Sequence, residues 1–225
     1  MRVVALIALL VASCDSGAGS PDGGTVAASL ELAIRPHGEP SGMVLSDATA
    51  SFGEIRLVSD HGEGLMAAAT VDLLEPETVI DLADAVPGLY SRVRLRLGPE
   101  TADTLRVDAA FGMVNLEMRA EDDGEIDLRC PSGERLDPGG HLRIDVDVDR
   151  GRWFQGIDLE SGEVEDGVLS LDPESGPNRD LAEMALDSIL GSFSIEGESQ
   201  DEHRDGNEDG GVEDHDGGVE DGGED

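Results

Sequence analysis

Much of the chain alternates apolar and charged residues with a period of two. In "HLRIDVDVD" (residues 141–149), for example, every second residue is Leu, Ile or Val. Successive side chains of a β-strand point to opposite faces, so such a segment has one apolar and one polar face. An amphipathic helix would need apolar residues every three or four positions instead. The pattern therefore predicts strands with one buried face from about residue 27 onward.

Turn-forming residues divide the alternating segments at intervals of about ten residues. The dividing stretches include "HGEPSG", "HGEG", "LGPETAD", "EDDGE" and "PSGERLDPGG". Short strands separated by such turns are typical of antiparallel sandwiches, in which each sheet contributes one face to a shared core. We therefore expect a mainly β fold, an antiparallel β-sandwich, over residues 26–195.

One segment near the end of this domain has a helical pattern instead. In "NRDLAEMALDSIL", apolar residues recur at a spacing of four, Asn178 or Asp180 can cap the start, and Gly191 follows the last apolar residue. These features predict one short C-terminal helix over about residues 180–190. The next residues, "SFSIEG", predict a last strand.

The first thirteen residues have the features of an export signal. Arg2 precedes an apolar run from Val3 to Val11, which as a helix would span about half of a ~30 Å bilayer core. The run is too short to cross a membrane and suits a secretory signal. The "VASC" that follows resembles the bacterial lipobox, which implies cleavage between Ser13 and Cys14 and a lipid on Cys14. An ordinary signal peptide with an incidental cysteine is the alternative.

Residues 14–25 are rich in Gly, Ser, Asp and Pro, a composition that predicts a flexible tether. Lipidated cysteines of the lipobox type carry three acyl chains, more than the two hydrophobic signals that stable anchoring requires. We therefore expect a lipid-anchored protein of the bacterial cell envelope, attached to the outer membrane. Asp15, directly after the anchor, makes the inner membrane the alternative.

Acidic residues dominate the charge of the chain: 51 Asp and Glu stand against 15 Arg and no Lys, for a net charge of −36. Nucleic acid is a poor partner for such a protein because phosphate binding needs a basic surface. The missing lysine excludes a P-loop, a Schiff-base lysine and a Ser-x-x-Lys nucleophile. The histidines form no zinc motif, and no Gly-x-Ser-x-Gly motif is present. We expect no enzymatic activity.

Two strands carry charges of a single sign along one face. These rows are Arg92, Arg94 and Arg96, and Asp145, Asp147 and Asp149. If the two strands are neighbours, the rows would pair, and each pair would stabilise the sheet by a few tenths to about 1 kcal/mol. The alternatives are an aspartate row that binds Ca²⁺ and an arginine row that binds an anionic ligand.

Aromatic residues and cysteines are scarce. We interpret Trp153, Phe154 and Tyr90 as core or corner packing, with a sugar-stacking platform as the alternative. Cys130 is the only other cysteine, so lipidation of Cys14 leaves no partner for an intramolecular disulfide. We therefore expect Cys130 to be a small, semi-buried side chain near a turn.

The last thirty residues, 196–225, form an acidic Asp/Glu/Gly tract whose composition predicts a disordered, self-repelling tail. Within it, Asp205, Asn207, Asp209 and Asp216 have the spacing of positions 1, 3, 5 and 12 of an EF-hand loop. Position 12 is Asp rather than the bidentate Glu, and no amphipathic helix flanks the loop. Weak, millimolar calcium binding is therefore the alternative interpretation, and calcium is the one cofactor that the sequence suggests.

Several stretches resemble a domain of unknown function common in secreted bacterial lipoproteins. They are "VDLLEPETVIDLADAVPGLYSRVRLRLG" with its Pro87-Gly88-x-Tyr90 turn, "HLRIDVDVDRGRWF" and "GVLSLDP". The resemblance covers about residues 27–173. It implies a prealbumin-like or immunoglobulin-like sandwich and implies no activity.

We therefore expect a lipid-anchored envelope protein whose non-catalytic sandwich has a structural or adhesive role toward an envelope protein or polymer. The alternative is a surface module that binds calcium or another ligand, such as a carbohydrate.

Overall fold

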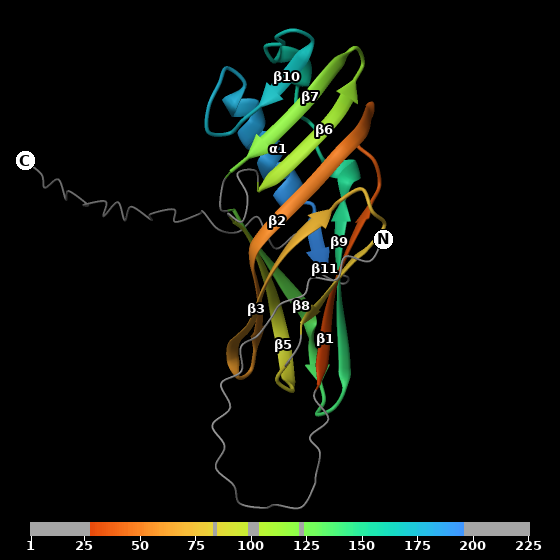
Figure 1. Ribbon diagram of the computed structural model, residues 1–225, viewed down its shortest axis with the longest axis vertical. Coiled ribbons are helices and arrows are strands. Elements are labelled where there is room, and N and C mark those ends of the chain that lie inside the picture. The colour runs from red at the N-terminus through yellow and green to blue at the C-terminus, as the bar shows by residue number, and fades with distance from the viewer. Residues whose placement is uncertain (1–27, 83–84, 99–103, 122–123, 196–225) are drawn as a thin grey trace, which may run out of the picture.

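The computed structural model describes residues 28–82, 85–98, 104–121 and 124–195 (Figure 1). These residues form strands, two 3-10 helices and one α-helix. The elements are β1 (Ser29–His37), β2 (Met43–Ser59), β3 (Gly62–Asp72), β4 (Thr78–Leu82), β5 (Gly88–Leu97), β6 (Leu105–Phe111), β7 (Val114–Ala120), β8 (Glu125–Leu136), β9 (His141–Asp149), η1 (Arg150–Arg152), η2 (Leu159–Ser161), β10 (Val168–Leu171), α1 (Arg179–Leu190) and β11 (Phe193–Ile195).

The strands form two sheets, which confirms the predicted mainly β fold with a single helix. One sheet has four strands in the order β11-β9-β1-β4, and the other has seven, in the order β10-β7-β6-β2-β5-β8 with β3 also paired to β2. Most pairs are antiparallel, as expected. Two are parallel, β1 with β9 and β7 with β10. Alternation reports which face of a strand is buried and not the direction of its neighbour, so the sequence did not predict these pairs.

The seven-stranded sheet is built around β2, which at 17 residues is its longest strand. β5 pairs with β2 from Phe52 to Ser59, and β6 continues along β2 from Met43 to Ala50. Backbone hydrogen bonds bridge the two regions: Gly98 N donates to Ser51 O (3.3 Å) and Ser51 N donates to Thr104 O (2.7 Å). β2 therefore runs through both the upper and the lower half of the molecule (Figure 1).

Gly53 marks the junction of the two halves. The pairing register of β2 shifts across this residue relative to both of its neighbouring strands, β3 and β5. A Cβ atom on Gly53 would lie 3.1 Å from the Cα atom of Gly98, which directly follows β5, so the close approach of the two backbones requires glycine. Bulges bend a strand and increase its twist, which lets β2 continue from the upper part of the seven-stranded sheet into the lower part.

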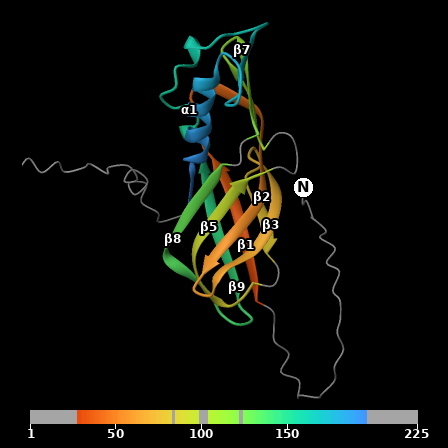
Figure 2. The ribbon, with the colours of Figure 1, turned by 90° about the vertical axis from the view of Figure 1, so that its left-hand side faces the viewer.

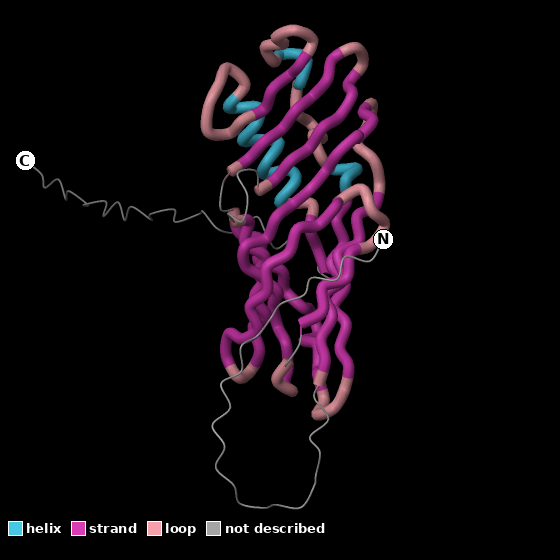
Figure 3. Tube along the Cα trace, in the orientation of Figure 1, coloured by secondary structure: helices cyan, strands magenta, loops and turns pink. Residues whose placement is uncertain are grey.

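Below the junction, the two sheets lie face to face (Figures 1 and 2). Alternate residues fill the space between them; they include Leu30, Leu32 and Ile34 of β1, Ile55 and Leu57 of β2, Val93 and Leu95 of β5, and Ile144 and Val146 of β9, all buried. Above the junction, α1 covers one face of the sheet (Figure 3) and buries Ala182, Ala185, Leu186 and Ile189. The other face of the upper sheet carries charged side chains.

The aromatic residues pack inside the domain, as predicted. Trp153 is buried and its Nε1 donates to Ser192 Oγ at 2.9 Å. Phe52 meets Phe193 edge to face, with ring centroids 6.2 Å apart, a favourable geometry for an aromatic pair. Buried Tyr90 donates its hydroxyl to Val86 O at 2.7 Å, across the Pro-Gly turn. The same kind of contact, from a tyrosine to upstream backbone, occurs in immunoglobulin-type sandwiches.

The helix lies at residues 179–190, as its pattern indicated, with Asn178 at the N-cap position. The side chain of Asn178 makes no capping hydrogen bond. Its Oδ1 accepts from Glu163 N (2.7 Å), and its Nδ2 donates to Glu163 O (2.9 Å) and Ser170 O (3.0 Å). This buried amide therefore joins the loop before β10, the strand β10 and the start of α1.

Replacing Asn178 with alanine should lower the free energy of unfolding by about 2–3 kcal/mol, because it leaves buried backbone groups without partners. Urea unfolding followed by circular dichroism measures the loss. The matched control is Asn115→Ala on β7, where the side chain is exposed, and a loss below about 0.5 kcal/mol is expected there. Equal losses in the two variants would contradict this role of Asn178.

Candidate functional site

The outer face of the lower seven-stranded sheet carries a dense group of arginines. On three neighbouring strands, β2, β5 and β8, the outward positions form three rows in register. The rows are Glu54, Arg96 and Glu125; Arg56, Arg94 and Asp127; and Val58, Arg92 and Arg129. We call this surface the arginine face, and it is turned toward the viewer in Figure 2.

Carboxylates of the same surface pair with several of these arginines. Arg92 Nη1 and Arg94 Nε lie 3.0 and 3.3 Å from Asp127 Oδ2. Arg56 forms an ion pair with Glu54 on its own strand. The other oxygen of Asp127, Oδ1, is buried and accepts no hydrogen bond from the described residues. Asp127 therefore holds two arginine side chains together at the centre of the arginine face.

The arginine face has more positive than negative side chains, whereas the chain as a whole is strongly negative. Five arginines stand in these three rows against three carboxylates. The flanking strand β3 adds Glu63 opposite Val58, so the rows keep a small excess of positive charge in a chain of net charge −36. The sequence singled out Arg92, Arg94 and Arg96, with an anionic ligand as one alternative. It missed Arg56 and Arg129, because only the strand order places them beside this row.

The two strands that carry the arginine row and the aspartate row are not neighbours, so the condition for pairing the two rows is not met. The arginine row lies on β5 in the seven-stranded sheet, and the aspartate row lies on β9 in the four-stranded sheet. Each row instead finds partners within its own sheet. Sequence alternation showed that both rows face outward, but two outward faces of a sandwich point away from each other.

The outer face of the four-stranded sheet holds a cycle of four charges. Arg35 lies 3.0 Å from Glu77 and 3.1 Å from Asp145. Arg143 pairs with the same two carboxylates, at 2.8 Å from Asp145. The hydrogen bond from Arg35, together with that from Arg143, lowers the pKa of Glu77 below its ordinary value. The aspartate row is therefore part of an ion-pair network.

A third charged group lies on the open face of the upper sheet. Arg106 Nη2 donates to Asp108 Oδ2 at 2.7 Å, and Arg119 Nη1 donates to Asp108 Oδ1 at 2.6 Å. Burial of Asp108 raises its pKa, but the arginine contacts lower it by more, so the pKa lies below the ordinary 3.8. Asp47 also pairs with Arg106, at 3.1 Å.

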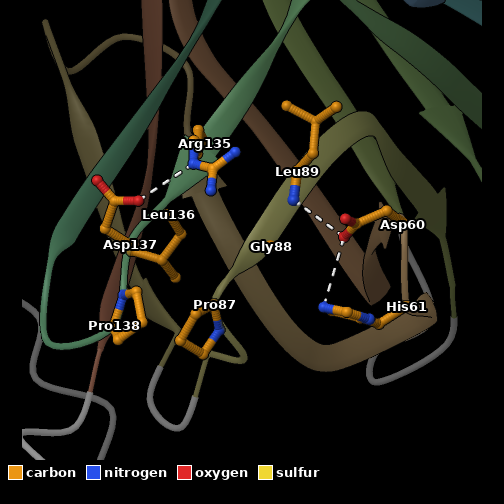
Figure 4. A pocket seen from close by; sticks show the side chains of 9 residues that line it. All are labelled: Asp60, His61, Pro87, Gly88, Leu89, Arg135, Leu136, Asp137 and Pro138. Atoms are coloured by element: carbon orange, nitrogen blue, oxygen red, sulfur yellow. Dashed lines mark hydrogen bonds and ion pairs between the residues drawn. The ribbon is translucent and has the colours of Figure 1, made fainter.

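A shallow depression of about 230 Å³ lies at the lower end of the sandwich (Figure 4). The β2–β3 turn, the start of β5 and the end of β8 form its walls. Asp60 Oδ1 accepts a hydrogen bond from Leu89 N (3.0 Å) and lies 3.7 Å from His61 Nε2, while Arg135 pairs with Asp137. The side chains of Arg135 and Asp137 are 77% and 72% exposed. These charges pair with each other in water, which suits a surface feature rather than a ligand pocket.

The site residues predicted from the two ends of the chain lie outside the described residues. They are the cleavage and lipidation positions Ser13 and Cys14, and the calcium candidates Asp205, Asn207, Asp209 and Asp216. Among the described residues, no three His, Cys, Asp or Glu side chains come together as a metal site. No helix within the described ranges is long and apolar enough to cross a membrane.

Cys130 and His141 lie within the described part of the chain. Cys130 is buried. The ring of His141 contacts Ser29 at 3.0 Å and Glu31 at 3.6 Å, both on the adjacent strand β1.

Comparison of the chain with protein-family models, with curated proteins and with solved structures finds no match. The resemblance to lipoprotein domains therefore stays a prediction from the sequence.

Replacing Asp108 with asparagine should lower the free energy of unfolding at neutral pH by about 1 kcal/mol, because two charge-assisted hydrogen bonds weaken. The pKa of Asp108 is lowered in the folded protein, so its contribution is complete well above pH 3.8 and is lost as the pH falls through the lowered value. Urea unfolding at a series of pH values should show the two proteins converging below pH 3.8.

Glu117→Gln is the control for Asp108, because Glu117 is 52% exposed and lies 4.0 Å from Arg119. Its effect should be smaller at every pH. A gap between wild type and Asp108→Asn that stays constant down to acid pH would contradict the ion-pair origin.

Proposed function

We propose that this protein is a lipid-anchored component of the bacterial cell envelope, with a non-catalytic sandwich in a structural or adhesive role. The observation that carries the proposal is the N-terminal sequence, in which one charge, a short apolar run and the small residues Ala12 and Ser13 lead to Cys14. A signal peptidase that accepts small residues would cleave before Cys14 and leave it as the acylated first residue.

The tether and the fold support an anchored role. Residues 15–24, "DSGAGSPDGG", have the composition of a flexible linker. A linker of ten residues can hold the domain a few tens of Å from the membrane surface. The first strand, β1, begins at Ser29, so the sandwich would follow the lipid after a short spacer.

The distribution of charges supports binding by a surface. Most of the ion pairs of the described residues lie on the outer faces of the sheets, and the depression in Figure 4 is open and lined by a mixture of charged and apolar residues. Envelope proteins or polymers are the partners that we propose for these faces. Five of the six aromatic residues are buried and Phe111 is half-buried, which leaves the carbohydrate alternative without an exposed stacking surface.

Cells that express the protein and receive a labelled fatty acid should transfer the label to it, and Cys14→Ala should abolish this labelling because the thiol that receives the lipid is removed. The variant should also leave the membrane fraction. Cys130→Ala is the matched control: this second cysteine is buried in the domain, so labelling should stay at the wild-type level. Labelling that survives in Cys14→Ala would overturn the anchor.

Fractionation of the same cells shows which of the two membranes holds the protein. Density-gradient separation of the two membranes should place the wild type in the outer membrane. Recovery in the inner membrane would favour the sorting role of Asp15 instead.

A calcium-binding module is the second candidate, because the Asp205, Asn207 and Asp209 spacing with Gly210 at the sixth position matches a calcium loop. Titration calorimetry of the whole protein should then show binding in the millimolar range. A variant with Asp205→Asn, Asp209→Asn and Asp216→Asn should lose that heat, since each change removes a charged ligand. Equal heats from both proteins would exclude this loop.

A further inference from the structure

The arginine face contains an arrangement that sheets usually avoid. In its second row Arg56 lies opposite Arg94, and in its third row Arg92 lies opposite Arg129. Like charges directly opposite on neighbouring strands destabilise a sheet. Across β2, β5 and β8 these two rows hold four arginines and one carboxylate, Asp127, and β3 adds one more acidic residue, Glu63, opposite Val58. Each arginine interacts with neighbours, so the feature is an excess of positive charge and not a set of unpaired groups.

Such a surface suits an extended chain of carboxylates. Guanidinium groups are planar and bind carboxylates through two parallel hydrogen bonds. Arginines two residues apart on one strand are about 6.6 Å apart, and those on neighbouring strands are about 4.8 Å apart. Carboxylates along an extended acidic peptide have a similar spacing, so several can contact the arginine face at once.

The chain itself continues with an acidic peptide from a point beside this face. The last described strand, β11, pairs with β9 at the edge of its sheet and also lies against β8, as the blue end of the chain in Figure 2 shows. β8 is one of the three strands of the arginine face. Thirty residues follow Ile195, and fourteen of them are Asp or Glu against one arginine, Arg204. Extended, they could reach about 100 Å.

A covalently linked polyanion has an advantage over one in solution. The net charge of −36 repels any anionic molecule that approaches from a distance, and only the local excess on the arginine face attracts it. A segment that begins beside β8 is held near the face at an effective concentration of about the millimolar range. It therefore needs only a weak contact to occupy the face.

We propose that residues 196–225 fold back onto the arginine face and occupy it through ion pairs with Arg56, Arg92, Arg94 and Arg129. The contact is electrostatic and lies on the protein surface, so salt weakens it. The tail then competes with any other anionic partner for this face. This contact does not depend on the lipid anchor.

Modification of arginine by phenylglyoxal, read residue by residue by mass spectrometry, tests this contact on the full chain in detergent. At about 20 mM salt, Arg92, Arg94 and Arg129 should react about three- to tenfold more slowly than at about 500 mM, where charges are screened. The comparison protein carries amides in place of the fourteen acidic residues of the tail. In that variant the three arginines should react at the high-salt rate at both concentrations.

Arg179 on α1 is the internal control, because it is exposed and pairs with Glu183 on its own helix; its rate should be the same in both proteins. Added polyglutamate should protect the arginine face only in the amide variant. Equal rates in the two proteins at low salt would overturn the proposal. Equal protection of both by polyglutamate would do so too, and would show that the face prefers an external polyanion.

Discussion

The fold depends on β2, the long strand that joins the two halves of the molecule. Its 17 residues pair with β6 above the junction and with β5 below it, and the register shifts at Gly53 mark a bend between these two parts of the sheet. A side chain at Gly53 would press against the backbone of Gly98. The bend lets a single sheet pack against α1 at one end and against the four-stranded sheet at the other, so one hydrogen-bonded frame supports a core that runs through both halves.

This frame decides which charged residues meet. The register of β2, β5 and β8 brings together arginines from three segments that are far apart in the chain. The sandwich also puts the arginine row and the aspartate row on opposite outer surfaces, so the ion pairs of each row form within its own sheet. In a strongly acidic protein, where most of the surface repels anions, a local excess of arginine is a specific feature, and it carries our proposal for the acidic tail.

Much of the fold could be predicted because its signals are local. Alternation identified the buried faces of β1, β5 and β9, a spacing of four with a terminal glycine identified α1, and the scarcity of aromatic residues pointed to Trp153 as core. The parallel pairs and the true partners of Arg94 and Asp145 could not be predicted, because both depend on strand order. Asn178 or Asp180 was expected to cap α1; Asn178 occupies the N-cap position, but its amide bonds to Glu163 and Ser170 instead of to the helix, since folding brings these residues within reach.

The sequence by itself determined that the chain forms strands with one apolar face, that the protein is strongly acidic, and that a lipobox-like motif precedes a flexible stretch. These properties reside in neighbouring residues, so periodicity and composition are enough to find them. The tertiary structure decided which outward rows share a surface, where the two halves join, and where the last strand ends relative to the arginine face. Contacts between distant segments depend on packing and register. The alternation of apolar and polar residues does not predict them, because it is the same whichever strand lies next to it.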